Sequence, residues 1–395
     1  MINNKLGYYA IDKCLYDSKI LACIEGTKSN KDIKWIFNND VFEKYNWTVE
    51  PDFTLDQLYD KRSRQLREMY DYIIISYSGG ADSHNIVESF IRQGLHIDEL
   101  IINTMEKGNS KFTILDPKIK NPENAASEHY LQTIPRLNEI KNRSPKTKIT
   151  ILDLTDHLFT HWLSNNDASW ILNKKEGLNP LNVTRFNYLH FNEVRKKFDK
   201  DKKIAVILGI EKPRTFIHSN NKFYLRFTDR AANIVGIADY FKDYVNSTVE
   251  FFYWSPDSCD ILCKQAHIIK RWLEKDPINY SIWFHKNMTK HMYRLVHERI
   301  LRTLIYTTWD NTWFQCDKAT KDWYSEFDSW FINNLSGTDH HNVWLEGIRY
   351  VEKYAAKFVN IDDNKADGLI TFSYNYFIGQ MNPSIDLKKI YNPVY

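Results

Sequence analysis

The chain has 395 residues, 43% of them hydrophobic, which is enough for two domains or one large domain around a sizeable core. Its formal net charge of +3 argues against a strongly basic nucleic-acid binder, although local contact with nucleic acid stays open. No run of about 18 apolar residues is present, and residues 1–5 do not start a secretory signal, so the sequence predicts no membrane association.

The cysteines are few and odd in number: Cys14, Cys23, Cys259, Cys263 and Cys316. This pattern fits a reducing compartment, and we expect a cytoplasmic protein. Cys259 and Cys263 are four residues apart, which would place two thiols on one helical face. A zinc site normally takes four ligands and no second pair accompanies them, so we predict two half-buried structural residues.

Residues 1–65 are predicted to form a small N-terminal addition of mixed α and β structure. Short strands are expected over residues 6–10 and 20–24. A helix is expected to follow, with Thr54 as its N-cap and Gln57 as the partner of Thr54 in a capping box.

From residue 66 to residue 255 apolar strands alternate with amphipathic helices. The predicted strands cover residues 72–77, 100–102, 149–154, 204–208 and 249–253, and the helices 86–91 and 125–140. Such alternation predicts an α/β fold, with a parallel five-stranded sheet and helices on both faces. The remaining residues, 256–395, are expected to be mostly helical. A segment rich in Trp from Trp309 to Trp330 would cap a substrate cleft or pack on the sheet.

The residues Ser78-Gly79-Gly80-Ala81-Asp82-Ser83 lie between the first strand of this region and its first helix. A strand that turns sharply through glycines into a helix presents converging N–H donors and the positive end of the helix dipole, which together suit a phosphate. Gly79 and Gly80 permit a close approach. Ser78 and Ser83 add hydroxyl donors, and Asp82 either caps the helix or ligates Mg²⁺.

This loop lacks the lysine of the GxxxxGK[ST] motif and the spacing of GxGxxG. It resembles the PP-loop of the N-type ATP pyrophosphatases, an adenine nucleotide α-hydrolase-like superfamily whose signature is SGGxDS after the first strand of a parallel sheet. Five positions match that signature: Ser78, Gly79, Gly80, Asp82 and Ser83. The resemblance covers residues 66–255 and implies a HUP-like fold. It also implies that the loop holds the pyrophosphate part of ATP with Mg²⁺, that pyrophosphate is released and that AMP remains on a substrate oxygen.

Two further groups of residues follow strand ends. In folds of this kind the adenine lies near the end of the second strand, here Asn103 and Thr104, although an ordinary turn is an equal reading. Gly209 follows the fourth strand and precedes Lys212 and Arg214. Ligands bind outside the carboxyl ends of parallel strands, so these two cations are predicted to act with the loop aspartate on phosphates or a substrate anion. The alternative is that Lys212 and Arg214 are solvated charges on the surface. The phosphoadenosine phosphosulfate reductases have basic residues after a similar glycine, and the resemblance to them is distant.

Absent motifs narrow the choice within this superfamily. The sequence has no Cys-Gly-x-His tail, no paired CxxC set and no cysteine at position 2, where Ile2 stands. The elements Asn46-Trp47, Arg64 to Arg67, Lys212-Pro213-Arg214 and Trp254 to Asp257 resemble those of PP-loop proteins from large tailed phages. This likeness predicts a phage origin and the host cytoplasm as location.

The sequence therefore predicts an ATP-dependent adenylating enzyme, a ligase or transferase that forms AMP and pyrophosphate. It would activate a small-molecule or nucleic-acid acceptor for amide, amine or sulfur transfer. Nucleotide or nucleic-acid modification is the expected setting. Two alternatives stay open: a non-catalytic module that senses ATP, and a sulfonucleotide reductase-like enzyme that uses a partner's thiol. The acceptor, the donor and the oligomeric state are not predicted.

Overall fold

The structure is a computed structural model. It describes residues 7–16, 18–104, 128–153, 166–167, 193–218, 220–229, 246–283, 296–314, 336–355, 359–362, 365–368 and 371–382.

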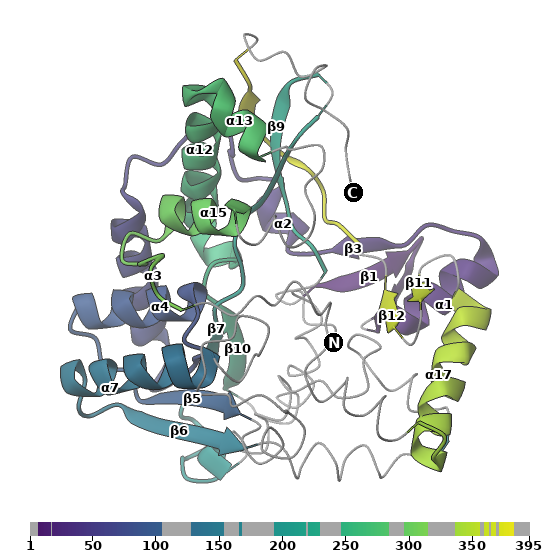
Figure 1. Cartoon of the computed structure of the whole chain (residues 1–395), viewed down its shortest axis with the longest axis horizontal. Helices are drawn as coiled ribbons and strands as arrows, with labels where there is room; N and C mark the ends of the chain where they lie inside the picture. Colours follow the sequence, from purple (N-terminus) through teal and green to yellow (C-terminus); the bar gives the residue numbers. More distant parts are fainter. Residues whose placement is uncertain are drawn as a thin grey trace.

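A five-stranded sheet lies at the centre of the fold, and all of its strands are parallel (Figure 1). Its members are β4 (Tyr72–Ser76), β5 (Glu99–Thr104), β6 (Lys148–Asp153), β7 (Ile204–Leu208) and β10 (Ser247–Phe251). The predicted strands are therefore confirmed, and the fold is α/β and HUP-like. All five residues of β7 are buried. Because successive side chains point to opposite faces, both faces of this strand are covered.

The strands are arranged in the order β10-β7-β4-β5-β6. The first strand along the chain, β4, is thus central. The chain builds the sheet outward through β5 and β6, then returns to the other side of β4 to add β7 and β10. The order reverses between β4 and β7, and open α/β sheets bind ligands in the crevice at such a point. The loop after β4 and the residues after β7 therefore meet where a ligand is expected.

In the described part of the chain, two helical segments lie between the first three strands. Helix α4 (Ala81–Arg92) lies between β4 and β5, and a π-helical turn, η2 (His129–Thr133), leads into α7 (Ile134–Arg143) before β6. Both crossovers advance in one direction across the sheet, so the right-handed rule puts α4 and α7 on one face. Figure 1 shows them in one layer beside β5 and β6. The described part of the predicted helix over 125–140 is helical, and Pro135 lies just after the π-helical turn.

Helix α3 (Leu55–Met69) packs against α4 and begins as predicted. The backbone N–H of Gln57 donates to Thr54 Oγ1 at 3.2 Å, and the N–H of Thr54 donates to Gln57 Oε1 at 2.9 Å. The capping box is therefore complete.

The N-terminal addition holds an antiparallel sheet in the order β2-β1-β3, formed by β1 (Tyr8–Ile11), β2 (Cys14–Tyr16) and β3 (Lys34–Ile36). The strand expected over residues 20–24 is wrong, because this segment belongs to helix α1 (Lys19–Ser29). Ser18 caps that helix by accepting the N–H of Leu21 at 3.4 Å, and the left-handed Asn30 ends it. A short apolar run does not by itself distinguish a strand from a buried helix, and here the flanking residues decide. The short helix α2 (Asn39–Phe42) follows β3.

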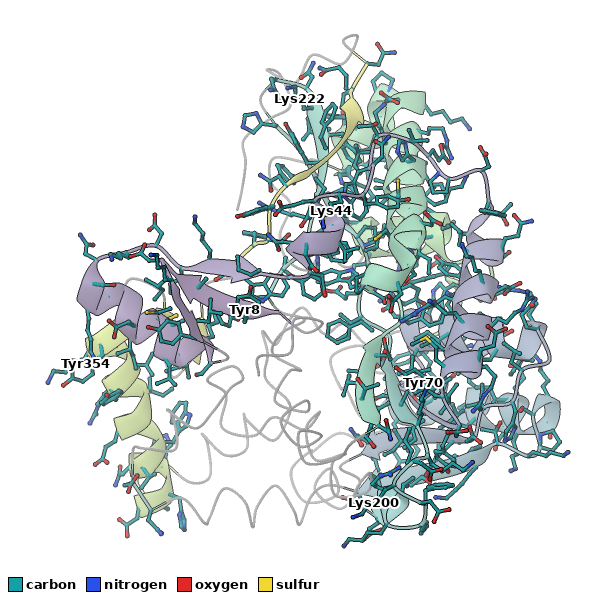
Figure 2. The ribbon with its side chains drawn as sticks, turned by 180° about the vertical axis from the view of Figure 1, so that it is seen from behind. Tyr8, Lys44, Tyr70, Lys200, Lys222 and Tyr354 are labelled. Carbon is teal, nitrogen blue, oxygen red and sulfur yellow. The ribbon has the colours of Figure 1, made fainter. Side chains whose placement is uncertain are left out.

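The residues described beyond 255 are largely helical, as expected. They form the 3₁₀ turn η5 (Pro256–Ser258) and the helices α12 (Cys259–Lys275), α13 (Pro277–Trp283), α15 (Glu298–Ile305) and α17 (Asp339–Ala355). Helix α17, which carries Tyr354, packs on α1 and lies away from the parallel sheet (Figure 2). A hairpin of β11 (Val359–Asp362) and β12 (Lys365–Gly368) follows it.

A third sheet was not predicted. Strand β13 (Tyr376–Gln380) pairs with β9 (Lys222–Arg226), which pairs in turn with β8 (Arg214–Ile217), all antiparallel. This sheet joins the last described segment to the strands that follow β7, so pairing crosses the predicted boundary at residue 255.

Contacts between distant aromatic and charged residues hold these regions together. Phe42 of α2 stacks on Phe227, just after β9, with ring centroids 4.6 Å apart. The buried carboxylate of Asp229 accepts from the hydroxyl of Tyr9 at 3.0 Å and from Lys19 Nζ at 2.5 Å. Among the described residues no helix is both long and apolar enough to cross a membrane.

The capping box gives a prediction about stability. Replacing Thr54 by Ala should lower the free energy of unfolding by about 1 kcal/mol, because the first turn of α3 loses its side-chain acceptor. Denaturant titration followed by circular dichroism measures this change. Thr54→Ser keeps the oxygen and should stay near the parent value, and equal losses in both variants would contradict a capping role.

Candidate functional site

The segment Ser78–Ser83 leaves β4 and enters α4 at the point where the strand order reverses. Gly79 adopts a φ of +76°, a backbone conformation that favours glycine. Gly80 is the N-cap residue of α4, and its carbonyl accepts the N–H of His84 at 2.9 Å. No side chain in the described part of the chain caps this helix. Its first N–H groups and the positive end of its dipole therefore suit an anion.

The two serine hydroxyls have different roles. Ser83 Oγ is buried, accepts the N–H of Ser78 at 3.2 Å and donates to the carbonyl of Gly80 at 3.2 Å. This hydroxyl holds the shape of the loop. Ser78 is exposed, and its Oγ accepts the N–H of Gly80 at 3.3 Å. The Ser78 hydroxyl is therefore the one that can reach a ligand.

The π-helical turn covers one side of the loop. Gln132 Nε2 donates to the carbonyl of Gly79, and Thr133 Oγ1 donates to the carbonyl of Ser78 at 2.9 Å. A Cβ atom on Gly79 would lie 2.5 Å from Thr133 Oγ1 and 2.9 Å from its Cα. Gly79 is consequently buried, whereas Ser78 is exposed and Gly80 partly so.

The structure brings together Asp82 and Lys212, two of the three residues predicted to be catalytic. Lys212 Nζ donates to Asp82 Oδ2 at 2.6 Å, with 8% and 24% of the respective side chains exposed. Tyr306 Oη donates to the other carboxylate oxygen, Oδ1. The prediction that Asp82 caps α4 is wrong, because both of its oxygens are directed to these two partners and α4 has no side-chain cap.

Gly209 allows the end of β7 to approach the loop. A Cβ atom at this position would lie 3.2 Å from Asp82 C, Asp82 Cβ and the N atom of Ser83. Lys212 then follows within reach of the carboxylate. Arg214 begins β8 instead, and its Nη2 donates to both carboxylate oxygens of Glu211 at 3.0 and 3.1 Å.

Asn103 and Thr104 end β5, the strand beside β4. Thr104 is buried. The side-chain oxygen of Asn103 is also buried and accepts no hydrogen bond from the described residues. A buried polar atom without a partner is costly, so this oxygen is a natural acceptor for a ligand.

Aromatic and charged side chains pack beside the loop, between α4 and α7. His84 Nδ1 lies 3.2 Å from the hydroxyl of Tyr77, and burial lowers the pKa of His84 to about 4. The guanidinium of Arg136 lies 3.2 Å from the ring centroid of Trp313 and 5.3 Å from that of Trp309. Burial also lowers the pKa of Arg136. Trp309 thus packs beside the loop, within the part of 309–330 that the structure describes.

Sequence reasoning missed five residues that touch or flank the loop: Gln132, Thr133, Arg136, Tyr253 and Tyr306. Three of them, Gln132, Thr133 and Arg136, lie in the segment 125–140, which was predicted to be helical. The bonds from these side chains to the loop depend on tertiary packing.

The cysteine pair lies inside the protein. Cys259 and Cys263 are free and buried, and desolvation raises the pKa of each thiol to about 12. Cys263 Sγ donates to the carbonyl oxygens of Trp47 at 3.5 Å and Val49 at 3.4 Å. No group of three or more His, Cys, Asp or Glu side chains suited to a metal occurs within the described ranges. Cys316 lies outside them.

The donor set at the loop nevertheless fits magnesium that arrives with a nucleotide. Mg²⁺ binds through one or two carboxylates, keeps several waters and takes its other oxygens from phosphates. Asp82 supplies a partly exposed carboxylate, and Ser78 supplies an exposed hydroxyl in the same loop.

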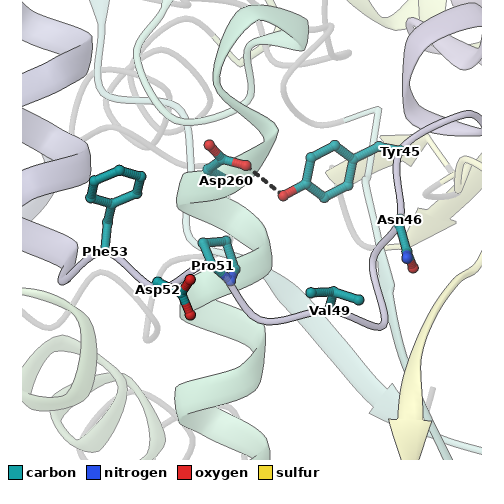
Figure 3. A pocket seen from close by; sticks show the side chains of 7 residues that line it. All are labelled: Tyr45, Asn46, Val49, Pro51, Asp52, Phe53 and Asp260. Carbon is teal, nitrogen blue, oxygen red and sulfur yellow. Dashed lines mark hydrogen bonds between the residues drawn. The ribbon is translucent and has the colours of Figure 1, made fainter.

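Two cavities lie away from the loop. The larger, of about 440 Å³, is lined by Tyr45, Asn46, Val49, Pro51, Asp52, Phe53 and Asp260 (Figure 3). Tyr45 Oη donates to Asp260 Oδ1 at 2.6 Å in its wall. The smaller, of about 270 Å³, lies between α3 and the start of α12. Neither cavity is lined by a residue of 78–83. The loop is the better candidate for a functional site than either cavity, because it combines helix N–H groups with a lysine.

No family model matches this chain, and no curated protein matches it either. The PP-loop resemblance and the phage origin therefore stay predictions that rest on the motifs alone.

The contact between Gly79 and Thr133 gives a second prediction. Gly79→Ala should cost about 1–2 kcal/mol for the left-handed backbone and about 1–3 kcal/mol more for the steric overlap. Gly94 is the matched control, since it has a φ of +63° and nothing within 4 Å of an added Cβ. Urea denaturation should show a larger loss for Gly79→Ala than for Gly94→Ala, and equal losses would contradict the close packing of the loop.

His84 gives a pH prediction. Its pKa falls from 6.5 in the unfolded chain to about 4 in the folded one, so between these values the unfolded state binds more protons. This contribution to stability is full above pH 6.5 and is lost as the pH falls toward 4, on the order of 3 kcal/mol. Thermal melts across this range should show a shallower pH dependence for His84→Gln than for the parent chain, whereas identical slopes would contradict a buried neutral imidazole.

Proposed function

We propose that this chain binds ATP with Mg²⁺ at Ser78–Ser83 and cleaves it between the α and β phosphates, leaving AMP on a substrate oxygen. One observation carries the proposal: an uncapped helix N-terminus and the ammonium group of Lys212 meet at the reversal point of a parallel sheet. The resemblance of the loop to SGGxDS agrees with it.

Each part of the nucleotide has a candidate partner. The N–H groups at the start of α4 and the charge of Lys212 suit the β and γ phosphates. The side-chain oxygen of Asn103 has no partner among the described residues, and the amino group of adenine could donate to it. Thr104, the next residue of β5, is buried, and its backbone groups are the ones that could contribute to the base site.

The step requires charge to be offset on the leaving group. A carboxylate or carbonyl oxygen of the acceptor bonds to the α-phosphorus, and the bond from that phosphorus to the bridging oxygen breaks. Lys212 and the loop amides bind the pyrophosphate that leaves, which stabilises the charge that develops on it. Asp82 would hold Mg²⁺, which supplies further charge neutralisation when bound. Arg214 is engaged by Glu211, and we give it no part in this step.

The alternatives predict different outcomes from the same site. A module that senses ATP would bind it and release no pyrophosphate. A sulfonucleotide reductase-like enzyme would take its thiol from a partner. Cys23, Cys259 and Cys263 are buried with pKa values raised to about 12, so apart from the exposed Cys14 the described thiols give little support to a reductase that uses its own. The acceptor is a small molecule or a nucleic acid, and nucleotide or nucleic-acid modification in a cytoplasm is the proposed setting.

Binding and pyrophosphate release test the proposal. Equilibrium dialysis should show that the parent chain binds ATP and that Lys212→Met weakens binding about tenfold or more, the loss expected for one charge-assisted contact. Incubation with panels of carboxylates and nucleic acids should release pyrophosphate for the right acceptor, and Asp82→Asn should abolish that release.

Lys264→Met is the matched control, because Lys264 is 15% exposed and pairs with Glu50 at 2.7 Å in another part of the protein. It should bind ATP like the parent chain. If Lys212→Met also binds like the parent, the proposed site is wrong. Binding without pyrophosphate for every acceptor would leave only the sensing module.

A further inference from the structure

Tyr306 reaches the loop from a distant part of the sequence. It directly follows α15 and is 1% exposed. Its N–H donates to the carbonyl of Arg302 at 2.8 Å, which ends the helix. Its ring lies against Tyr253 and Tyr59, with centroids 5.8 and 6.4 Å apart. Backbone and ring are therefore both fixed.

The neighbouring tyrosines fix the same region independently. Tyr59 Oη donates to the carbonyl of Ile305 at 2.6 Å, so α3 anchors the end of α15. Tyr253 Oη donates to the backbone carbonyl of Asp82 at 2.8 Å and accepts from Asn85 Nδ2 at 3.0 Å. The surrounding residues thus hold the Tyr306 hydroxyl in position to donate to Asp82 Oδ1.

The two partners of the Asp82 carboxylate differ in charge. Lys212 is a cation, so Mg²⁺ repels it and phosphates attract it. Tyr306 donates as a neutral hydroxyl. When a nucleotide binds with its metal ion, these charges draw Lys212 away from the carboxylate. They do not act on the neutral hydroxyl of Tyr306, which stays bonded to it.

We propose that Tyr306 is a positioning residue for Asp82: it keeps Oδ1 fixed while Lys212 moves to the phosphates, so that the carboxylate offers its other oxygen to magnesium in a set direction. This inference deepens the proposed function and rests on it. It makes residues 298–306, outside the region of the PP-loop resemblance, part of the nucleotide site.

Tyr306→Phe isolates the hydroxyl because the ring and its packing remain. Isothermal titration should show that this variant binds ATP with Mg²⁺ about tenfold more weakly than the parent chain, the loss expected for a hydrogen bond to a charged group. In EDTA the affinity for ATP should change by less than about twofold, because the orientation of the Asp82 carboxylate matters only when a metal ion binds to it.

Two variants serve as controls. Tyr376 is also buried, and its hydroxyl has no hydrogen-bond partner among the described residues. Tyr376→Phe therefore removes a hydroxyl of similar burial and should bind like the parent with and without Mg²⁺. In Asp82→Asn, adding Tyr306→Phe should cause no further loss, since the hydroxyl acts through the carboxylate.

Hydrogen exchange on the unaltered chain is a second measurement that needs no variant. ATP with Mg²⁺ should slow the exchange of amides in 298–306, because the bound metal holds the carboxylate to which Tyr306 donates, and ATP in EDTA should not. Unchanged exchange there, together with protection of the loop, overturns the inference. So does a Tyr306→Phe variant that binds like the parent, or one weakened equally with and without Mg²⁺. A parent chain that does not bind ATP overturns the proposed function, and the inference with it.

Discussion

The ion pair between Asp82 and Lys212 joins the two strand ends at which the parallel sheet reverses its order. Such a reversal opens a crevice because the connections after the two strands run in opposite directions. Here the two connections come into close contact. The positive φ of Gly79 turns the chain, and the missing side chain of Gly209 admits the second connection to within contact of the first. The charge pair and the helix N-terminus then share one small space.

Much of this arrangement could be predicted from local sequence. The β-branched run at 72–77 and the serine and glycine residues after it gave the first strand and the loop. Thr54 and Gln57 gave the start of α3 through the reciprocal bonds that their side chains make. Lys212 was found because residues after a central parallel strand face the ligand side. Each of these signals lies within a few residues of the feature that it predicts.

The errors came where short segments were ambiguous. The apolar run at 20–24 resembles a strand, and only the cap at Ser18 shows that it is a helix. The hairpin of β8 and β9 was overlooked although it carried a signal. Two asparagines precede β9, and Asn221 adopts a φ of +61° in the turn. Its partner β13 could not have been foreseen, since a strand more than a hundred residues later completes the sheet.

The long reach of these contacts bears on how the chain folds. The bond between Tyr306 and Asp82 spans 224 positions, and that between Tyr9 and Asp229 spans 220. During synthesis from the N-terminus, the strands and helices around the loop leave the ribosome well before the segment that fastens the aspartate. Non-local contacts of this kind slow folding and leave an interval in which apolar surface is open to chaperones or to aggregation. Completion of the loop is thus a late event, coupled to arrival of the C-terminal helices rather than to formation of the sheet.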